Sequence, residues 1–164
     1  SGSDVILIPE KPYDINEVAE HCQMRSKRGK RFTIICIAEG AKPRDGTQAI
    51  ARIDPTSPDP VRLGGIGEQL ADDITKLTGL ETRTPVLGHV QRGGTPCAAD
   101  RILATNFGYH ATELLKDGRF NRLVVRQAHG YTDIDFLRAS IKQRTVPMND
   151  PLIKAAKAVG TCFG

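Results

Sequence analysis

The sequence predicts an α/β fold, a Rossmann-like layered domain in which a mostly parallel sheet is flanked by helices. Two apolar runs, "DVILIPE" (4–10) and "RFTIICIAEG" (31–40), have the composition of strands covered on both faces. Segments with helical spacing alternate with such runs, which favours a parallel sheet. With 164 residues, 39% hydrophobic and 26% charged, the chain fits a single domain over 1–164.

The first half carries two helical patterns separated by a polar stretch. Asp14 opens the first pattern, with Glu17 placed as in a capping box, and Gly29 stops it. The charged, Pro-rich and Gly-rich stretch 41–65 predicts a surface insertion, with an extended piece at Ala49–Ile53. The second pattern ends at Gly79, and its apolar positions are Ile66, Leu70, Ile74 and Leu77.

The second half is predicted to continue the alternation. A strand, or a strand-like approach, over 82–89 leads to a glycine-rich loop, and Thr95-Pro96 is a good N-cap and first residue for the next helix. That helix is expected to end near Gly118, with an apolar face of Leu103, Phe107, His110, Ala111 and Leu114. A strand at 122–127 and helices at Asp133–Lys142 and Asp150–Val159 are predicted after it, the first with Thr132 as N-cap and Asp133 and Asp135 in its first turn.

Composition excludes several classes of protein. No run approaches the roughly 18 apolar residues that span a bilayer, and the N-terminus lacks a signal-peptide pattern, so a cytoplasmic protein with no membrane contact is expected. The four cysteines are scattered, which predicts no zinc or other metal site and no redox motif. We interpret them as small buried side chains in a reducing compartment. The net charge of +4 suits an anionic ligand without requiring one.

The segment "GHVQRGGTP" (88–96) is the strongest functional signal from residue chemistry. In a parallel sheet, ligands bind where strands end and helices begin. Arg92 offers a rigid fork of donors for phosphate oxygens, and His89 can donate a hydrogen bond. Gly93 and Gly94 allow the backbone to approach closely, and the N–H groups that open the next helix favour an anion. The segment therefore predicts a phosphate site, although a tight turn with a structural histidine is the simpler alternative.

The order of residues in "RTPVLGHVQRGGTPCAADR" (83–101) resembles the signature segment of the phosphofructokinase family. The runs "VILIPE", "IICIAEG", "GGIGEQLADDI" and "DRILATNFGYHATELL" are also similar to the second half of that family, in the same order. The resemblance covers nearly the whole chain and is weakest over 41–64 and after about residue 120. Members of the family phosphorylate fructose 6-phosphate at its 1-hydroxyl in glycolysis.

The resemblance implies roles for four residues. Glu39 matches a glutamate that binds the sugar hydroxyls, and a carboxylate can accept from two neighbouring hydroxyls. Arg83, His89 and Arg92 match contacts to the substrate, the first two to its 6-phosphate. In tetrameric relatives the residue matching Arg83 reaches across from a neighbouring subunit, so a homo-oligomer with Arg83 at an interface is implied. Asp100 and Arg101 are interpreted as structural.

The resemblance also implies that this chain is a C-terminal half. The family's first half carries the loop for the phosphoryl donor and its Mg²⁺, and a Thr-x-Asp-x-Asp segment with the general base; neither is found in the sequence. We therefore expect no catalytic residue in this chain and no bound cofactor. ATP or pyrophosphate, together with Mg²⁺, would be bound mainly by the missing N-terminal half, and the fragment alone would be inactive.

A basic cluster at 24–31, "MRSKRGKR", admits several interpretations. In effector-regulated relatives, residues at the positions of Arg28 and Lys30 hold the phosphates of a nucleotide, with Asp4 as a candidate partner. The bland alternative is a helix end whose positive charges suit the helix dipole. A nucleic-acid patch is disfavoured because the run is short and lacks aromatic residues. For the whole chain, a sugar-phosphate or nucleotide-binding module without catalysis stays open as the alternative function.

Overall fold

The computed structural model describes residues 2–46, 50–53, 61–63, 65–141 and 144–164, which form two compact units. Unit 1 comprises Ser1–Val86 and Thr145–Gly164, and unit 2 comprises Leu87–Arg144. The single-domain organisation stays a prediction. None of the helices in the described ranges is long and apolar enough to cross a membrane.

Unit 1 is built around a parallel pair of strands. β1 (Val5–Leu7) pairs in parallel with β2 (Ile35–Ile37). On the other side of β1, Cys162 extends the parallel pairing, since its carbonyl accepts from Ile6 N–H at 2.9 Å and its N–H donates to Asp4 O at 2.9 Å. The α/β class with parallel strands is thereby confirmed.

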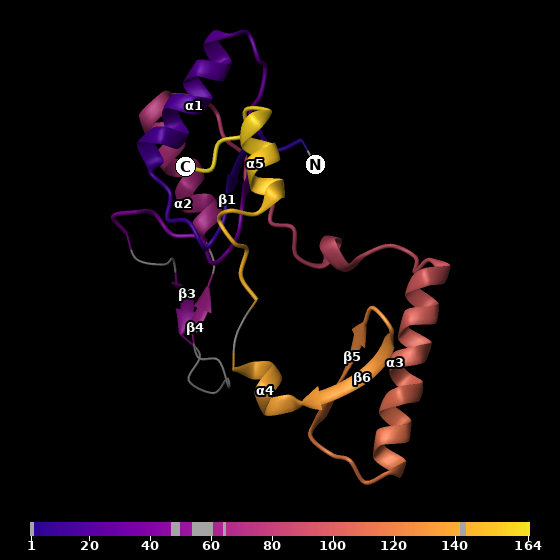
Figure 1. The fold of residues 1–164 in the computed structure, drawn as a ribbon. Helices are drawn as coiled ribbons and strands as arrows, with labels where there is room; N and C mark the ends of the chain where they lie inside the picture. Colours follow the sequence, from indigo (N-terminus) through magenta and orange to yellow (C-terminus); the bar gives the residue numbers. More distant parts are fainter. Residues whose placement is uncertain (1, 47–49, 54–60, 64, 142–143) are drawn as a thin grey trace. The chain divides into compact units, whose positions relative to one another are not determined.

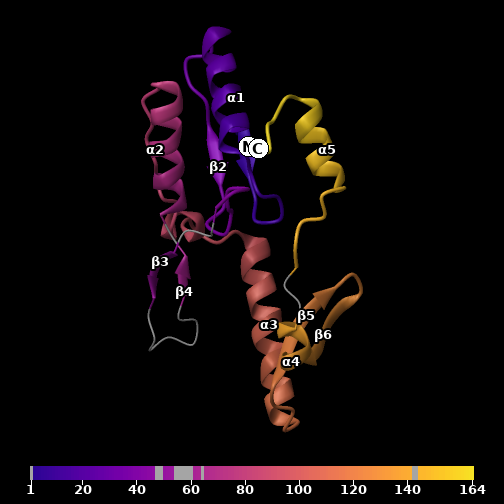
Figure 2. The ribbon, with the colours of Figure 1, turned by 90° about the vertical axis from the view of Figure 1, so that its left-hand side faces the viewer.

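Three helices flank this pair. α1 (Ile15–Lys27) begins at the predicted N-cap, where Asp14 accepts from Asn16 N–H at 2.9 Å. α2 (Ile66–Thr78) ends at Gly79, which has φ +71° as a left-handed C-cap requires. α1 packs against α2, and α5 (Pro151–Ala158) lies on the other side of the β1–β2 pair from α2 (Figures 1 and 2).

The core of unit 1 lies where α1 and α2 cover β1. Val5, Leu7 and Val18 are fully buried. The predicted apolar stripe of α2 is confirmed at Ile66, Leu70 and Ile74, whereas Leu77 is 47% exposed and does not belong to it. The rest of the cluster is Tyr13, Ala19, Cys22 and Ala41.

The predicted insertion 41–65 contains an antiparallel hairpin. β3 (Ile50–Ile53) matches the predicted extended piece except for residue 49, and it pairs with β4 (Val61–Leu63), which was not predicted. Residues 47–49, 54–60 and 64 of this stretch lie outside the described residues.

Unit 2 consists of a long helix and a second antiparallel hairpin. η1 (His89–Arg92) is a 3₁₀ turn, and α3 (Ala98–Lys116) follows it. β5 (Arg122–Gln127) confirms the predicted strand and pairs with β6 (Gly130–Asp135), and α4 (Phe136–Ser140) comes after β6. α3 lies along this hairpin (Figure 1).

Three predicted boundaries in the second half are wrong. Residues 82–87 form no strand, because Thr82 donates to Ala71 O at 3.2 Å and holds the segment along α2. α3 begins after Cys97 rather than Thr95, since the Asp100 carboxylate accepts from Cys97 N–H at 2.9 Å.

The predicted helix Asp133–Lys142 is the third wrong boundary. Thr132 and Asp133 lie in β6, and Asp135 is the N-cap of α4, accepting from Leu137 N–H at 2.9 Å. Residue 142, the predicted end, lies outside the described residues. The helix predicted at Asp150–Val159 is confirmed as α5, with Asp150 as its N-cap.

The prediction that all four cysteines are buried is also wrong. Cys22 is buried and Cys162 half-buried, but Cys36 and Cys97 are exposed. β2 has no second neighbour among the described strands, and the N-terminal end of α3 has no buried residue, so neither place covers a thiol. All four are free thiols.

Candidate functional site

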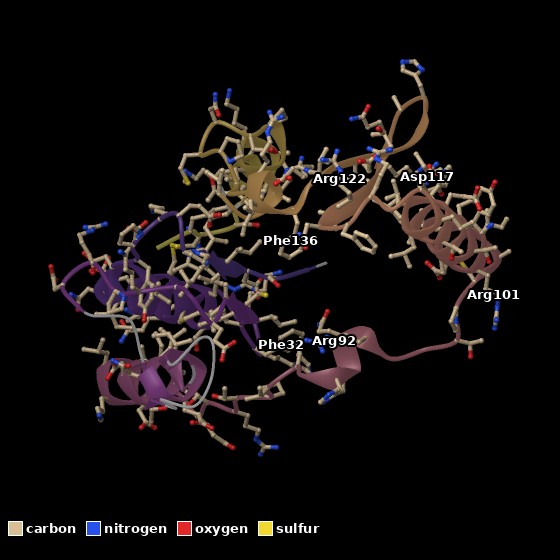
Figure 3. All side chains as sticks on the ribbon, turned by 90° about the horizontal axis from the view of Figure 1, so that it is seen from below. Phe32, Arg92, Arg101, Asp117, Arg122 and Phe136 are labelled. Atoms are coloured by element: carbon tan, nitrogen blue, oxygen red, sulfur yellow. The ribbon has the colours of Figure 1, made fainter. Side chains whose placement is uncertain are left out.

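His89 and Arg92 occupy one turn of 3₁₀ helix. Gln91 N–H donates to Gly88 O at 3.2 Å and Gly93 N–H to Val90 O at 3.2 Å, which fixes the turn from His89 to Arg92. Side chains three residues apart eclipse each other in a 3₁₀ helix. The two phosphate-binding candidates therefore project from the same side of η1, and both are exposed; Figure 3 labels Arg92 on this turn.

Gly94 lies where the chain leaves this turn. Its φ of +101° lies in a region that L side chains rarely adopt, so the second glycine of the pair is required by the backbone. Gly93 is extended, with φ −77° and ψ 173°. The backbone dihedrals therefore require glycine at position 94 but not at position 93. At Gly93 the missing side chain would allow a ligand to approach the backbone closely.

The N-terminus of α3 already has an acceptor of its own. Asp100 and Cys97 form a reciprocal capping box in which each side chain accepts from the other residue's backbone N–H. The hydrogen bond from Cys97 N–H is the main cause that lowers the pKa of the Asp100 carboxyl below its usual value. Asp100 therefore has the structural role expected of it. Because this helix end already has a carboxylate acceptor, η1 is a better candidate for the anion site than the N-terminus of α3.

Glu39 lies in the turn directly after β2, at the carboxyl end of the strand. The turn is closed by Ala41 N–H, which donates to Ala38 O at 2.9 Å. The Glu39 side chain is exposed, and within the described ranges it has no hydrogen-bond or ion-pair partner. Its carboxylate is available to accept from hydroxyl groups.

Arg83 sits on the irregular segment after α2 and pairs with Glu81. Its Nε and Nη2 atoms lie 3.1 and 2.9 Å from Glu81 Oε1. Both side chains are mostly exposed, at 86% and 77%, and such surface pairs contribute only about 0–1 kcal/mol. Glu81 is a neighbour of the site that the sequence analysis missed, although the opposite charge two residues before Arg83 was a visible signal.

Gly67 links the segments that carry Glu39 and Arg83. A Cβ atom built on Gly67, in the first turn of α2, would lie 2.9 Å from Thr84 Cγ2 and 3.9 Å from Ile37 Cγ2. The residue next to Arg83 and the end of strand β2 therefore both border this glycine. Unit 1 thus brings the segments carrying Glu39 and Arg83 to the same end of α2, while His89 and Arg92 belong to unit 2. Convergence of all four side chains stays a prediction.

The candidate effector residues lie at the end of α1. Arg28 is the C-cap, and its N–H donates to Met24 O at 3.1 Å; Gly29 follows with φ +79°. Arg28 and Lys30 are exposed. Asp4, their candidate partner, is instead paired with Arg25, whose guanidinium lies 2.8 Å from Asp4 Oδ1.

No group of three or more His, Cys, Asp or Glu side chains in the described ranges could hold a metal ion.

Comparison with known proteins defines the class of this chain. The phosphofructokinase family model matches residues 1–115, and the chain belongs to that family. It is 42% identical over 163 residues to an ATP-dependent 6-phosphofructokinase 2 of Clostridium perfringens, a match that covers 99% of this chain and 44% of the relative. It is 43% identical over 163 residues to a pyrophosphate–fructose 6-phosphate 1-phosphotransferase of Streptomyces coelicolor, covering 99% and 46%.

Solved structures support the same fold. A pyrophosphate-dependent phosphofructokinase from Marinobacter aquaeolei matches with a TM-score of 0.63 at 17% identity, over 99% of this chain and 41% of that chain. A phosphofructokinase from Saccharomyces cerevisiae matches with a TM-score of 0.59 at 29% identity, over 85% and 17%. The chain spans less than half the length of the curated relatives it matches.

Proposed function

We propose that this chain is the fructose 6-phosphate-binding part of a longer 6-phosphofructokinase, which transfers a phosphoryl group to the 1-hydroxyl of fructose 6-phosphate. The observation that carries the proposal is that His89 and Arg92 stand three residues apart on a single exposed 3₁₀ turn, a spacing that puts both side chains on one side of it. A phosphate monoester is a dianion with three acceptor oxygens, which a guanidinium fork and an imidazole N–H match in charge and in hydrogen bonding.

The other two residues complete the recognition of the sugar phosphate. Glu39, exposed after β2, accepts from sugar hydroxyls. Arg83 exchanges its weak pair with Glu81 for the 6-phosphate, because a dianion competes well with one exposed carboxylate. We propose that Arg83 does so across a subunit interface of a homo-oligomer in the cytoplasm.

The donor side of the reaction belongs to the rest of the enzyme. The names of the relatives give ATP or pyrophosphate as the phosphoryl donor. Among the described residues, no group of three or more His, Cys, Asp or Glu side chains could hold a metal ion. We propose that Mg²⁺, the donor and the general base are held by the segment outside residues 1–164. Catalysis would then require both parts, since phosphoryl transfer depends on positioning and charge neutralisation. A purified 1–164 chain that turned over fructose 6-phosphate with either donor would contradict this division.

Arg28 and Lys30 are proposed to bind the phosphates of a nucleotide effector. Support comes from their exposure beside Lys27 and Arg25, at a helix C-terminus where the four cations concentrate positive charge. The Asp4–Arg25 pair holds Arg25 in place, whereas Arg28 and Lys30 are exposed and can meet an anion.

Steady-state kinetics of the longer protein tests the substrate assignment. Arg92→Ala and His89→Ala remove charge-assisted hydrogen bonds worth about 1.5–3 kcal/mol each, so KM for fructose 6-phosphate should rise about 10- to 100-fold. KM for the phosphoryl donor should stay unchanged. Arg126→Ala, which removes an exposed arginine from β5, is the matched control.

Equal effects of Arg92→Ala and Arg126→Ala on KM for the sugar phosphate would refute the assignment. Retained binding of fructose 6-phosphate by a longer protein without phosphotransfer would favour a binding module instead.

A further inference from the structure

The segment that carries Arg83 is held in unit 1 by threonine hydroxyls. Of residues 81–86, Thr82 is the one that is half-buried, and the other five are exposed. Among the described residues, no backbone–backbone hydrogen bond involves residues 81–87. A segment without backbone hydrogen bonds or buried apolar side chains depends on its side-chain hydrogen bonds for a fixed position.

The Thr82 hydroxyl takes part in two hydrogen bonds with α2. It donates to Ala71 O at 3.2 Å, and its oxygen lies 2.9 Å from Thr75 Oγ1. A hydroxyl has one proton, so Thr75 is the donor in the second bond. The neighbouring α2 residues Leu70 and Ile74 are buried in the core. Thr82 therefore ties the segment to a part of the helix that is itself fixed by the core.

Thr84 provides a second anchor one helical turn away. Its hydroxyl donates to Gly67 O at 3.4 Å. Gly67 and Ala71 lie four residues apart, which is about 6 Å along a helix axis, and two residues of extended chain span about 6.6 Å. The spacing of the two hydroxyls thus matches the spacing of the two carbonyl acceptors, and the segment runs along α2 in the opposite direction.

Arg83 lies between the two anchors and faces away from α2. Side chains alternate along an extended chain, and Thr82 and Thr84 both point to the helix. Arg83 is accordingly 86% exposed, on the same side of the segment as Glu81, to which its Nε and Nη2 donate. The backbone from which Arg83 projects is therefore fixed by the residues on either side of it.

We propose that Thr82 is a positioning residue for the binding of fructose 6-phosphate. Its hydroxyl does not touch the substrate but holds the backbone from which Arg83 reaches the 6-phosphate. The inference rests on the proposed function, in which Arg83 makes that contact. A side chain held in place loses less conformational freedom when it binds. The 6-phosphate is not the reacting group, so its contacts stabilise the bound substrate and the transition state equally and act on KM.

Steady-state kinetics of the longer protein tests this role. Thr82→Val removes both hydrogen bonds and keeps the branched shape, so KM for fructose 6-phosphate should rise about 5- to 10-fold with kcat within about twofold. Thr82→Ser keeps the hydroxyl and should change KM by less than about twofold. Thr112→Val is the matched control, since it removes a hydroxyl that donates to Gly108 O at 2.9 Å in α3. A rise in KM as large in Thr82→Ser or Thr112→Val as in Thr82→Val would overturn the proposal.

A double-mutant cycle with Arg83→Ala separates positioning from a general loss of structure. Once Arg83 is gone, Thr82→Val should raise KM by less than about a further twofold. The full rise in the Arg83→Ala background would overturn the positioning role. If Arg83→Ala left KM unchanged, the proposed contact of Arg83 would fail and this inference with it. If Arg83→Ala raised KM and Thr82→Val did not, this inference alone would fail.

Thr75→Val applies the same test from the helix side and leaves the sequence of the segment unaltered. It removes the shorter of the two hydrogen bonds and should raise KM for fructose 6-phosphate about 2- to 5-fold, with KM for the phosphoryl donor unchanged. This variant decides the question if Thr82→Val does not fold. An unchanged KM for the sugar phosphate in folded Thr75→Val would then overturn the proposal.

Discussion

Gly67→Ala tests the packing that joins the Glu39 and Arg83 segments. In the first turn of a helix, replacing glycine by alanine stabilises by up to about 1 kcal/mol through propensity. Here the new Cβ would lie 2.9 Å from Thr84 Cγ2, well inside the 3.5–4.0 Å at which carbon atoms attract each other. Overpacking of this kind costs about 1–3 kcal/mol. We expect the exposed Thr84 segment to move and the variant to gain little or no stability.

A double-mutant cycle isolates this contact. Thr84→Ser removes Cγ2 and keeps the hydroxyl, which donates to Gly67 O at 3.4 Å. In the Thr84→Ser background, Gly67→Ala should then raise the free energy of unfolding by the full propensity term. A coupling energy of at least about 0.5 kcal/mol is expected from urea denaturation. If Gly67→Ala stabilised both backgrounds equally, the two segments would not meet at this glycine.

Two further predictions concern stability. Leu7→Ala, at a fully buried side chain, should lower the free energy of unfolding by about 2–5 kcal/mol. Leu152→Ala, at a side chain 79% exposed, should change it by less than about 0.5 kcal/mol. Similar losses for the two variants in urea titrations would contradict the assignment of Leu7 to the core. His21 has a buried Nε2 without a hydrogen-bond partner in the described part of the chain, and burial, followed by the nearby Arg25 charge, lowers its pKa below the ordinary 6.5. The unfolded state therefore binds the proton more tightly, so stability should fall as pH drops through about 6.5 and level off below the folded-state pKa. His21→Gln should flatten that part of the pH profile, and an unchanged slope would assign it to another group.

Local signals predicted the elements of unit 1 well. Asp14, Gly29 and Gly79 mark helix ends through backbone and capping chemistry that neighbouring residues decide. The buried stripe of α2 also follows from spacing alone. Leu77 has the spacing of the stripe but is 47% exposed, which sequence spacing cannot show.

The errors in unit 2 arise from contacts between residues distant in sequence. Thr132 has the local chemistry of an N-cap, but β6 pairs with β5 over six residue pairs. Asp133 lies within 2.6 Å of the guanidinium groups of both Arg119 and Arg122, and the Arg122 hydrogen bond is the main cause that lowers the pKa of its carboxyl. Arg122 and Phe136 mark the end of the hairpin at which these pairs gather (Figure 3). Cross-strand pairing outweighs the cap, and the helix starts three residues later.

The candidate site was predicted from the order of residues rather than from their geometry. Sequence alone placed His89 and Arg92 in a loop, and the structure adds that a 3₁₀ turn aligns their side chains. The sequence could not show that Glu81 pairs with Arg83, because the pairing of exposed side chains depends on the path of the segment after α2. Capping of α3 by Asp100 was likewise visible only once the helix start was fixed at Cys97.

A structure of the longer protein with bound fructose 6-phosphate tests the central claim most directly. We expect the 6-phosphate oxygens within about 3.2 Å of donors on Arg83, His89 and Arg92, and the sugar hydroxyls at Glu39. A sugar phosphate bound elsewhere, with His89 and Arg92 facing solvent in the complete assembly, would contradict it.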